Sequence, residues 1–176
     1  MVATRFAVAA HILLLLAANF RAARDAQFEF RGALARSPAP LATSGRLALI
    51  VNTNPVVVRR IAGQLARAGL IRVHRGPGGA DLARPPEEIT LDDVWRAVNA
   101  GSTRPLVPLH ARAPGQDSRP GSRSCGPLAH DILAAAFGDA EAAFRKSLGH
   151  TTLDTLAQRL TTQEPAREIV KQAISA

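Results

Sequence analysis

Residues 52–84 read NTNPVVVRRIAGQLARAGLIRVHRGPGGADLAR and decide the fold of this chain. Asn54 followed by Pro55 predicts the start of a helix, because Asn caps helices and Pro is best tolerated at the first helical position. Apolar residues then recur at steps of three and four, which is the spacing of one buried helix face, formed here by Val58, Ile61, Leu65 and Ala68. Gly69 ends the predicted helix.

A hairpin is predicted directly after this helix. Ile71 and Val73 alternate with polar residues, which is strand spacing, and Gly76-Pro77-Gly78-Gly79 is a turn. Residues 80–83 form the returning strand. A capped helix followed by a basic hairpin is the pattern of a winged helix, in which the helix can enter a DNA groove with the hairpin beside it. Residues 52–84 hold six Arg and one Asp, so most of the formal net charge of +8 lies here.

The composition favours nucleic acid as the partner of this basic region. The chain has 176 residues, of which 47% are hydrophobic and 20% charged, as in a folded soluble protein. Only two of its 22 basic residues are Lys. Arg binds phosphate and guanine edges with two parallel hydrogen bonds, which favours nucleic acid over lipid. A GC-rich genome would also raise the Arg and Ala content, so the clustering of Arg is the informative feature.

The elements predicted on either side of residues 52–84 complete the fold. It is mainly α with a small β-hairpin wing, which is a winged helix-turn-helix. We expect a first helix over residues 4–18 and then a polar connection. Residues 20–40 of this connection are an insertion or an extended loop, with a short helix over 21–35 as the alternative. Thr43 is the predicted N-cap of a helix over 44–51. Thr90 and Asp93 form a capping box for the next helix. Residues 1–100 are therefore predicted to be one DNA-binding domain.

A second part of the chain is predicted to serve dimerisation. Residues 101–126 are a linker rich in Pro, Gly, Ser and Arg, and residues 127–148 are a long amphipathic helix. The apolar seam of this helix consists of Leu133, Phe137, Ala140, Phe144 and Leu148. One helix beyond a linker cannot bury such a seam alone, so we expect a second copy of the chain to cover it, with packing onto its own domain as the alternative. Residues 149–176 form a short helix, capped by Thr151 and Asp154, and a tail.

The apolar run over residues 6–18 allows two interpretations. It is too short for a transmembrane helix, but a secretory signal has a similar composition. In that alternative the protein is a small exported basic binding protein from which residues 1–18 are removed. In the other, the run is the buried first helix of the DNA-binding domain.

Twelve residues are the candidate DNA contacts. Helix starts, an exposed helix face and the hairpin tip are the places from which a winged helix reaches DNA. A cap or a solvated helix face is the ordinary structural alternative for each residue. The candidates are Arg5, Thr43, Ser44, Thr53, Asn54, Val56, Arg59, Arg60, His74, Arg75, Gly76 and Gly78.

Redox, metal and enzyme chemistry have little support in the sequence. Cys125 is the only cysteine, which excludes a disulfide framework and fits a reducing compartment. It is a candidate redox sensor, because an Arg-rich neighbourhood and a following helix start lower a thiol pKa, or else it is unreactive. The five His show no metal-binding spacing, and no nucleophile–base pair or phosphate loop is present, so we expect no enzyme.

Several segments together resemble the Rrf-two (Rrf2) family of bacterial winged-helix transcription regulators, which includes IscR, NsrR and CymR. RFAVAAHIL at residues 5–13 is similar to the first helix of the family's cluster-free YwnA-like branch. NTNPVVVRRI at 52–61 is similar to its recognition helix. RGPGG at 75–79 and LARPPEEITL at 82–91 resemble its wing, and LGHTTL at 148–153 resembles its C-terminal segment.

The resemblance implies a cytoplasmic homodimer that binds double-stranded DNA at a pseudo-palindromic operator, usually to repress. It also implies that residues 1–18 are a helix and not a cleaved signal. The family's sensing members hold an iron–sulfur cluster with three Cys, whereas this chain has Cys125 alone, so no cofactor is expected. No effector follows from the sequence. A non-specific nucleic-acid-binding protein, with the same charge but no preferred site, is a further alternative.

Overall fold

The computed structural model describes residues 2–29, 43–74, 78–101, 105–109 and 126–162. These residues form two compact units. The first unit comprises residues 1–100 and 148–176, and the second comprises residues 101–147. The predicted Arg75, Gly76 and Cys125 lie outside the described residues.

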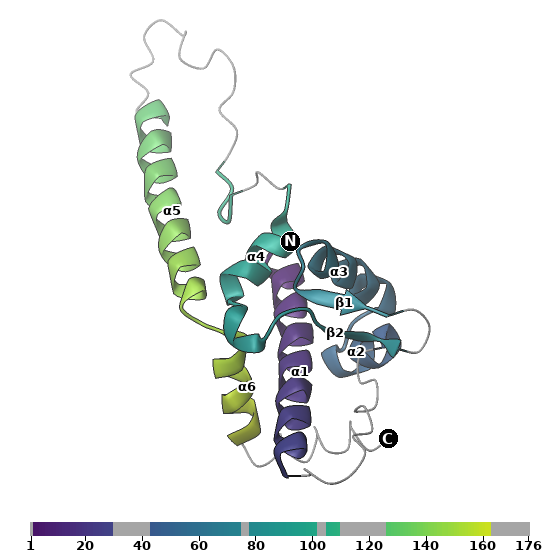
Figure 1. Ribbon diagram of the computed structural model, residues 1–176. Coiled ribbons are helices and arrows are strands. Elements are labelled where there is room, and N and C mark those ends of the chain that lie inside the picture. The colour runs from purple at the N-terminus through teal and green to yellow at the C-terminus, as the bar shows by residue number, and fades with distance from the viewer. Residues whose placement is uncertain (1, 30–42, 75–77, 102–104, 110–125, 163–176) are drawn as a thin grey trace, which may run out of the picture. The chain divides into compact units, whose positions relative to one another are not determined.

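The first unit is built around its N-terminal helix, α1 (Val2–Glu29). Figure 1 shows α1 between α6 (Leu153–Thr162) on one side and α2 (Ser44–Val51) and α3 (Pro55–Arg67) on the other. A short hairpin follows α3 and consists of β1 (Ile71–Val73) and β2 (Ala80–Leu82). The 3-10 helix η2 (Pro86–Glu88) and α4 (Leu91–Asn99) complete the unit. It is a winged helix-turn-helix, as the sequence predicted.

The first helix is longer than the sequence predicted. The expectation was a helix over residues 4–18 followed by a separate polar connection, but α1 continues without a break through Glu29. Residues 19–29 hold no Gly or Pro and contain three Ala and two Arg, which are good helix formers. The polar residues mark the point where α1 leaves the hydrophobic core, and the helix itself continues.

The apolar part of α1 is the centre of the hydrophobic core. Ile12 and Leu13 are fully buried, and they pack with α3 residues such as Ile61 and with Leu153 of α6. Residues 4–24 are long and apolar enough to cross a membrane, by a test that core helices and N-terminal signal sequences also pass. The burial of one face of α1 in this unit favours the core-helix interpretation. His11, by contrast, is exposed on the other face.

Local capping signals fix the other helices. Thr43 accepts a hydrogen bond from the Arg46 N–H and caps α2, and Asn52 ends it in the left-handed region. The capping box of α4 is complete, because the Asp93 N–H donates to Thr90 Oγ1 and the Thr90 N–H donates to Asp93 Oδ2. The cap by Thr43 and the capping box of Thr90 and Asp93 stand where the sequence predicted them.

The start of α6 is joined to the start of α4 by a backbone clasp. Thr90 and Thr152 form an antiparallel bridge. Beside it, the Leu91 N–H donates to the Thr151 carbonyl and the Leu153 N–H donates to the Ile89 carbonyl, each at 2.9 Å. These contacts join residues 151–153 to residues 89–91, so that α6 is held in the same unit as α4 although the two helices are far apart in the sequence.

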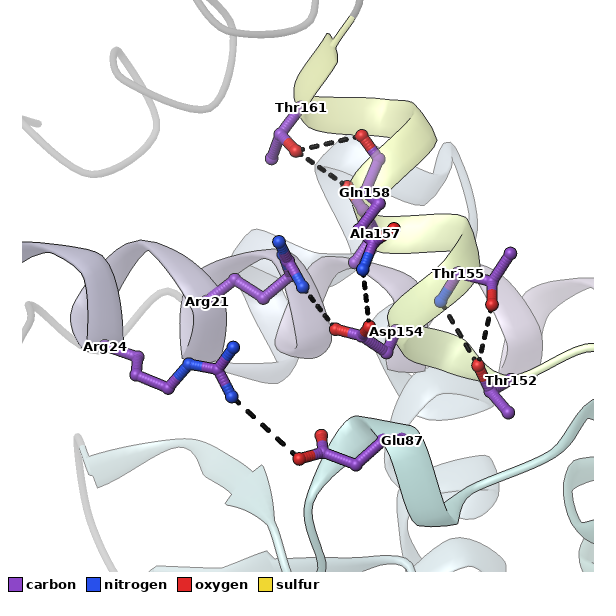
Figure 2. Close-up of polar contacts among 9 residues, drawn as sticks. All are labelled: Arg21, Arg24, Glu87, Thr152, Asp154, Thr155, Ala157, Gln158 and Thr161. Atoms are coloured by element: carbon purple, nitrogen blue, oxygen red, sulfur yellow. Dashed lines mark hydrogen bonds and ion pairs between the residues drawn. The ribbon is translucent and has the colours of Figure 1, made fainter.

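Side chains at the same place join α6 to α1 (Figure 2). Asp154 pairs with Arg21 and also accepts a hydrogen bond from Gln158 at 2.8 Å. The predicted cap of α6 by Thr151 and Asp154 is therefore wrong. Thr152 takes that role, because its Oγ1 accepts a hydrogen bond from the Thr155 N–H, and the carboxylate of Asp154 is turned toward α1 instead.

The second unit consists of residues 105–109 and most of α5 (Gly126–Gly149). The Leu106 N–H donates to Glu141 Oε2 at 3.0 Å, which fixes the extended segment against the helix. Pro105 and Val107 lie next to Phe137 around a shallow hollow.

Candidate nucleic-acid interface

The start of α3 is fixed by its cap. Asn54 has extended backbone angles, and its Oδ1 accepts a hydrogen bond from the Val56 N–H at 2.8 Å. Pro55 occupies the first helical position and has no N–H, and the Val58 N–H donates to the Asn54 carbonyl. Few backbone donors therefore remain at this helix start to bind a phosphate. Its outward surface is made mainly by side chains.

The two faces of α3 are sharply divided. Val58, Ile61 and Leu65 are buried, as predicted, but Ala68 is exposed because it is the C-cap and lies beyond the last buried turn. The opposite face carries the exposed residues Val56, Val57, Arg59, Arg60 and Arg67. This exposed face has the length and charge that a groove-binding helix requires.

The hairpin lies alongside α3, and β1 contacts it directly (Figure 1). Ile71 pairs with Leu82, Arg72 with Asp81, and Val73 with Ala80. Ile71 and Ala80 are buried, but Val73, the cross-strand partner of Ala80, is 57% exposed. The predicted alternation of buried and exposed residues along β1 is therefore correct for Ile71 and Arg72 but not for Val73.

The turn of the hairpin brings two predicted residues close together. His74 Nε2 lies 2.8 Å from Asp81 Oδ2, and both side chains are exposed. A Cβ atom on Gly78 would lie 2.7 Å from the Cβ of His74, so only glycine fits here without a shift of the hairpin. Gly79 adopts a φ of 66°, which also favours glycine.

Among the described residues, some arginines of the first unit pair with a carboxylate, and others do not. Arg21, Arg24 and Arg96 pair with the carboxylates of Asp154, Glu87 and Asp92. Within the described parts of the chain, no carboxylate pairs with the exposed arginines of α3 and the hairpin, which are Arg59, Arg60, Arg67, Arg72 and Arg84. Cations without local counterions, gathered on two adjacent elements, are the electrostatic arrangement that binds a polyanion.

The remaining predicted contacts lie at helix starts. Arg5 is half-buried in the first turns of α1, and Ser44 is half-buried at the first position of α2. Thr43 caps α2, and the Thr53 N–H donates to the Ala48 carbonyl in the connection between α2 and α3. Contact of these residues with DNA stays a prediction.

The predicted dimerisation seam lies on α5. Leu133 and Ala140 are exposed, and Phe137, Phe144 and Leu148 are half-buried. Phe137 borders the segment of residues 105–109. The role of this seam also stays a prediction.

The sequence interpretation missed exposed residues of the interface. Val57, Arg67 and Arg72 are exposed on α3 and β1 but were not among the candidates. Arg67 and Arg72 carry the same signal as Arg59, which is a positive charge on the polar side of a predicted element. Val57 has no such signal, because a Val beside two others in a helix start is expected to be buried.

The described residues do not fit a metal or cluster. Among them, no group of three His, Cys, Asp or Glu side chains lies close enough to hold an ion. Cys125 is the only cysteine of the full sequence. A cluster held by three thiolates of one subunit is therefore chemically incompatible with this chain.

Known proteins with the same fold have related sequences. Residues 32–159 match the family model Rrf2, described as an iron-dependent transcriptional regulator. YwnA of Bacillus subtilis (strain 168), provisionally assigned as an HTH-type transcriptional regulator, is 34% identical over 98 residues, which cover 56% of this chain and 59% of YwnA. The match thus spans about three-fifths of the length of this curated relative.

Solved structures show the same architecture. A protein provisionally assigned as DNA-binding is 27% identical, with a TM-score of 0.56 over 86% of this chain and 97% of the other. CymR of Staphylococcus aureus has 24% identity and a TM-score of 0.52, with 88% and 96% of the two chains covered. The second similarity concerns the fold alone.

Proposed function

The chain belongs to the Rrf2 family of transcriptional regulators, and we propose that it is a cytoplasmic, sequence-specific repressor that binds a pseudo-palindromic operator as a homodimer. The family consists of regulators and not enzymes, and the winged helix-turn-helix is a DNA-binding fold. The observation that carries the proposal is the set of arginines on α3 and the adjacent hairpin that have no carboxylate partner among the described residues. Sequence would be read by α3, and the hairpin would hold the flanking backbone.

A dimer is supported by the second unit. Leu133 is exposed on α5, and so are Leu128 and Ile132 on the same helix. A helix with this much exposed apolar surface is normally covered by another protein surface. A two-fold dimer would present two α3 helices to the two halves of a palindrome.

No iron–sulfur cluster is part of the proposed function. The family model is described as iron-dependent, but the sole Cys125 cannot supply a three-thiolate site. The regulator would therefore respond to another signal. Oxidation of Cys125 is the one redox response that the sequence offers.

Two alternatives make different predictions. An exported protein would lose residues 1–18, and with them Ile12 and Leu13 from the centre of the core. The mass of the mature chain isolated from its own cells tests this directly. A non-specific nucleic-acid-binding protein would show the same salt dependence but no ratio of specific to non-specific affinity.

Selection of binding sites from random double-stranded DNA tests the proposal itself. We expect enrichment of one inverted repeat, and gel shifts at fixed salt should then show that Arg59→Ala and Arg60→Ala weaken binding. Each lost phosphate contact lowers the slope of log K against log salt by about one unit. Arg159→Ala is the matched control, because Arg159 is equally exposed but lies on α6, on the other side of α1. Absence of any enriched sequence would contradict the proposal.

A further inference from the structure

The first turn of α3 exposes an apolar surface at the point where a recognition helix meets DNA. Pro55 is exposed, 63% of Val56 is exposed, and 39% of Val57 is exposed. In the same helix, Val58 is completely buried. Four neighbouring apolar residues at one helix start therefore divide into three exposed residues and one buried residue, and the three exposed ones are not part of the hydrophobic core.

Two polar side chains beside this surface are held by the backbone of the helix start. Asn54 Oδ1 accepts a hydrogen bond from the Val56 N–H at 2.8 Å, which fixes this side chain as the cap of α3. Arg59 Nε donates to the Pro55 carbonyl at 3.3 Å, which draws the base of that side chain back along the helix. The helix start thus presents methyl groups where hydrogen-bonding side chains would be expected for direct base readout.

The charge of the surroundings limits what can cover this surface. Arg59 and Arg60 follow within one turn and have no carboxylate partner among the described residues. An ordinary apolar protein surface would leave these cations without counterions. A DNA major groove supplies both phosphates and one exposed apolar group, the 5-methyl group of thymine.

We infer that Val56, assisted by Val57, reads thymine methyl groups in the major groove. This inference rests on the proposed function and names how the same surface chooses its sequence. Specificity at these positions comes from van der Waals contact and the exclusion of water from the methyl group. An RNA duplex does not offer this contact, because uracil lacks the methyl group and the major groove of an RNA duplex is too narrow for a helix.

Replacement of thymine by deoxyuridine tests the inference, because it removes one methyl group and leaves every hydrogen-bonding group in place. The probe is the inverted repeat obtained by selection, synthesised with deoxyuridine at one thymine position at a time. For the native protein, we expect binding to weaken about fourfold for each contacted methyl group, from the loss of one apolar contact. Val56→Ala should weaken binding to the thymine operator similarly and should no longer distinguish deoxyuridine at the same position.

Two variants serve as controls in this experiment. Val107→Ala makes the same chemical change at an exposed position in the second unit, so it should keep the native response to deoxyuridine. Arg59→Ala should weaken binding to thymine and deoxyuridine operators by equal factors. Thermal unfolding of Val56→Ala should match that of the native protein, since the side chain is mostly exposed.

The outcomes separate this inference from the proposed function. A specific operator that binds equally well with deoxyuridine at every position would overturn the inference and leave the proposed function intact. The same holds if Val56→Ala retains the full native response to deoxyuridine. Failure to select any preferred sequence would overturn both.

Discussion

The carboxylate of Asp154 on α6 accepts a hydrogen bond from the guanidinium of Arg21 on α1, and both side chains are about four-fifths buried, with 20% and 19% exposed. Figure 2 shows that a second pair, Arg24 with Glu87, lies beside it but is open to solvent, with 57% and 51% of the side chains exposed. The first pair joins two helices that are far apart in the sequence. The two pairs should therefore differ in their effect on stability.

Replacement of Asp154 by Ala should lower the free energy of unfolding by about 1–3 kcal/mol, because a charged hydrogen bond between partly buried groups is lost. Denaturant titration measures this change. Glu87→Gln is the matched control and should cost no more than about 1 kcal/mol, since that pair is solvated and its Nη1 and Oε1 atoms are 3.9 Å apart. Equal effects of the two substitutions would mean that burial does not distinguish the pairs.

Thr90→Ala should destabilise the first unit by about 0.5–2 kcal/mol, because the capping box of α4 loses the acceptor for the Asp93 N–H. Thr90→Ser keeps that oxygen and should retain most of the stability. Chemical unfolding of both variants checks the prediction. A Ser variant as unstable as the Ala variant would show that the methyl group, and not the cap, is what matters.

Leu13→Ala should lower the free energy of unfolding by about 2–5 kcal/mol, because the side chain is completely buried in the core. His11→Ala changes the same helix on its exposed face and should have little effect. If α1 were a dispensable leader, neither variant would alter the unfolding of the remaining chain. Thermal and chemical unfolding of the full-length protein can therefore test the alternative of an exported protein.

Leu133→Glu should convert the proposed dimer into monomers, because it places a charge in the apolar seam of α5. Ala142→Glu introduces the same charge at an exposed position on the other side of the helix and should leave the dimer intact. Analytical ultracentrifugation over a range of concentrations measures the difference. A native protein that is monomeric at all concentrations would contradict the dimer proposal before any variant is made.

Anaerobic reconstitution with iron and sulfide should leave the protein without a bound cluster, since Cys125 is its only thiol. Visible absorption and iron analysis after desalting provide the measurement. Stoichiometric iron with a thiolate absorption band would show that another set of ligands, or residues of a second subunit, completes a site. DNA binding should be the same before and after this treatment.

The sequence predicted those elements whose boundaries are set by local chemistry. Thr43 and Asn54 are caps, and Pro55 can only begin a helix, so α2 and α3 were predicted to within a residue. The end of α1 was missed although residues 19–29 include good helix formers, because their polarity indicated a connection, and the pairing of Arg21 with Asp154 cannot be read from this stretch. Non-local partners are not visible in a window of neighbouring residues.

The same distinction applies to the candidate site. Charge and spacing identified Arg59 and Arg60, but they could not separate arginines with carboxylate partners from those without. Arg96 pairs with Asp92 one turn away, a spacing that could have been read from the sequence. Helix spacing also predicted the exposure of Val56, but the exposure of Val57 depends on how α3 is rotated against the core, which only the packed structure shows.

The clasp between Thr90 and Thr152 has a consequence for the synthesis of this protein. A ribosome makes α1 first, but the helix that covers one side of α1 begins only at Leu153. A nascent chain that already contains α3 and the hairpin would still expose the apolar side of α1 that α6 covers in the folded protein. We therefore expect competence for DNA binding to arise only after α6 has been synthesised and has packed against α1.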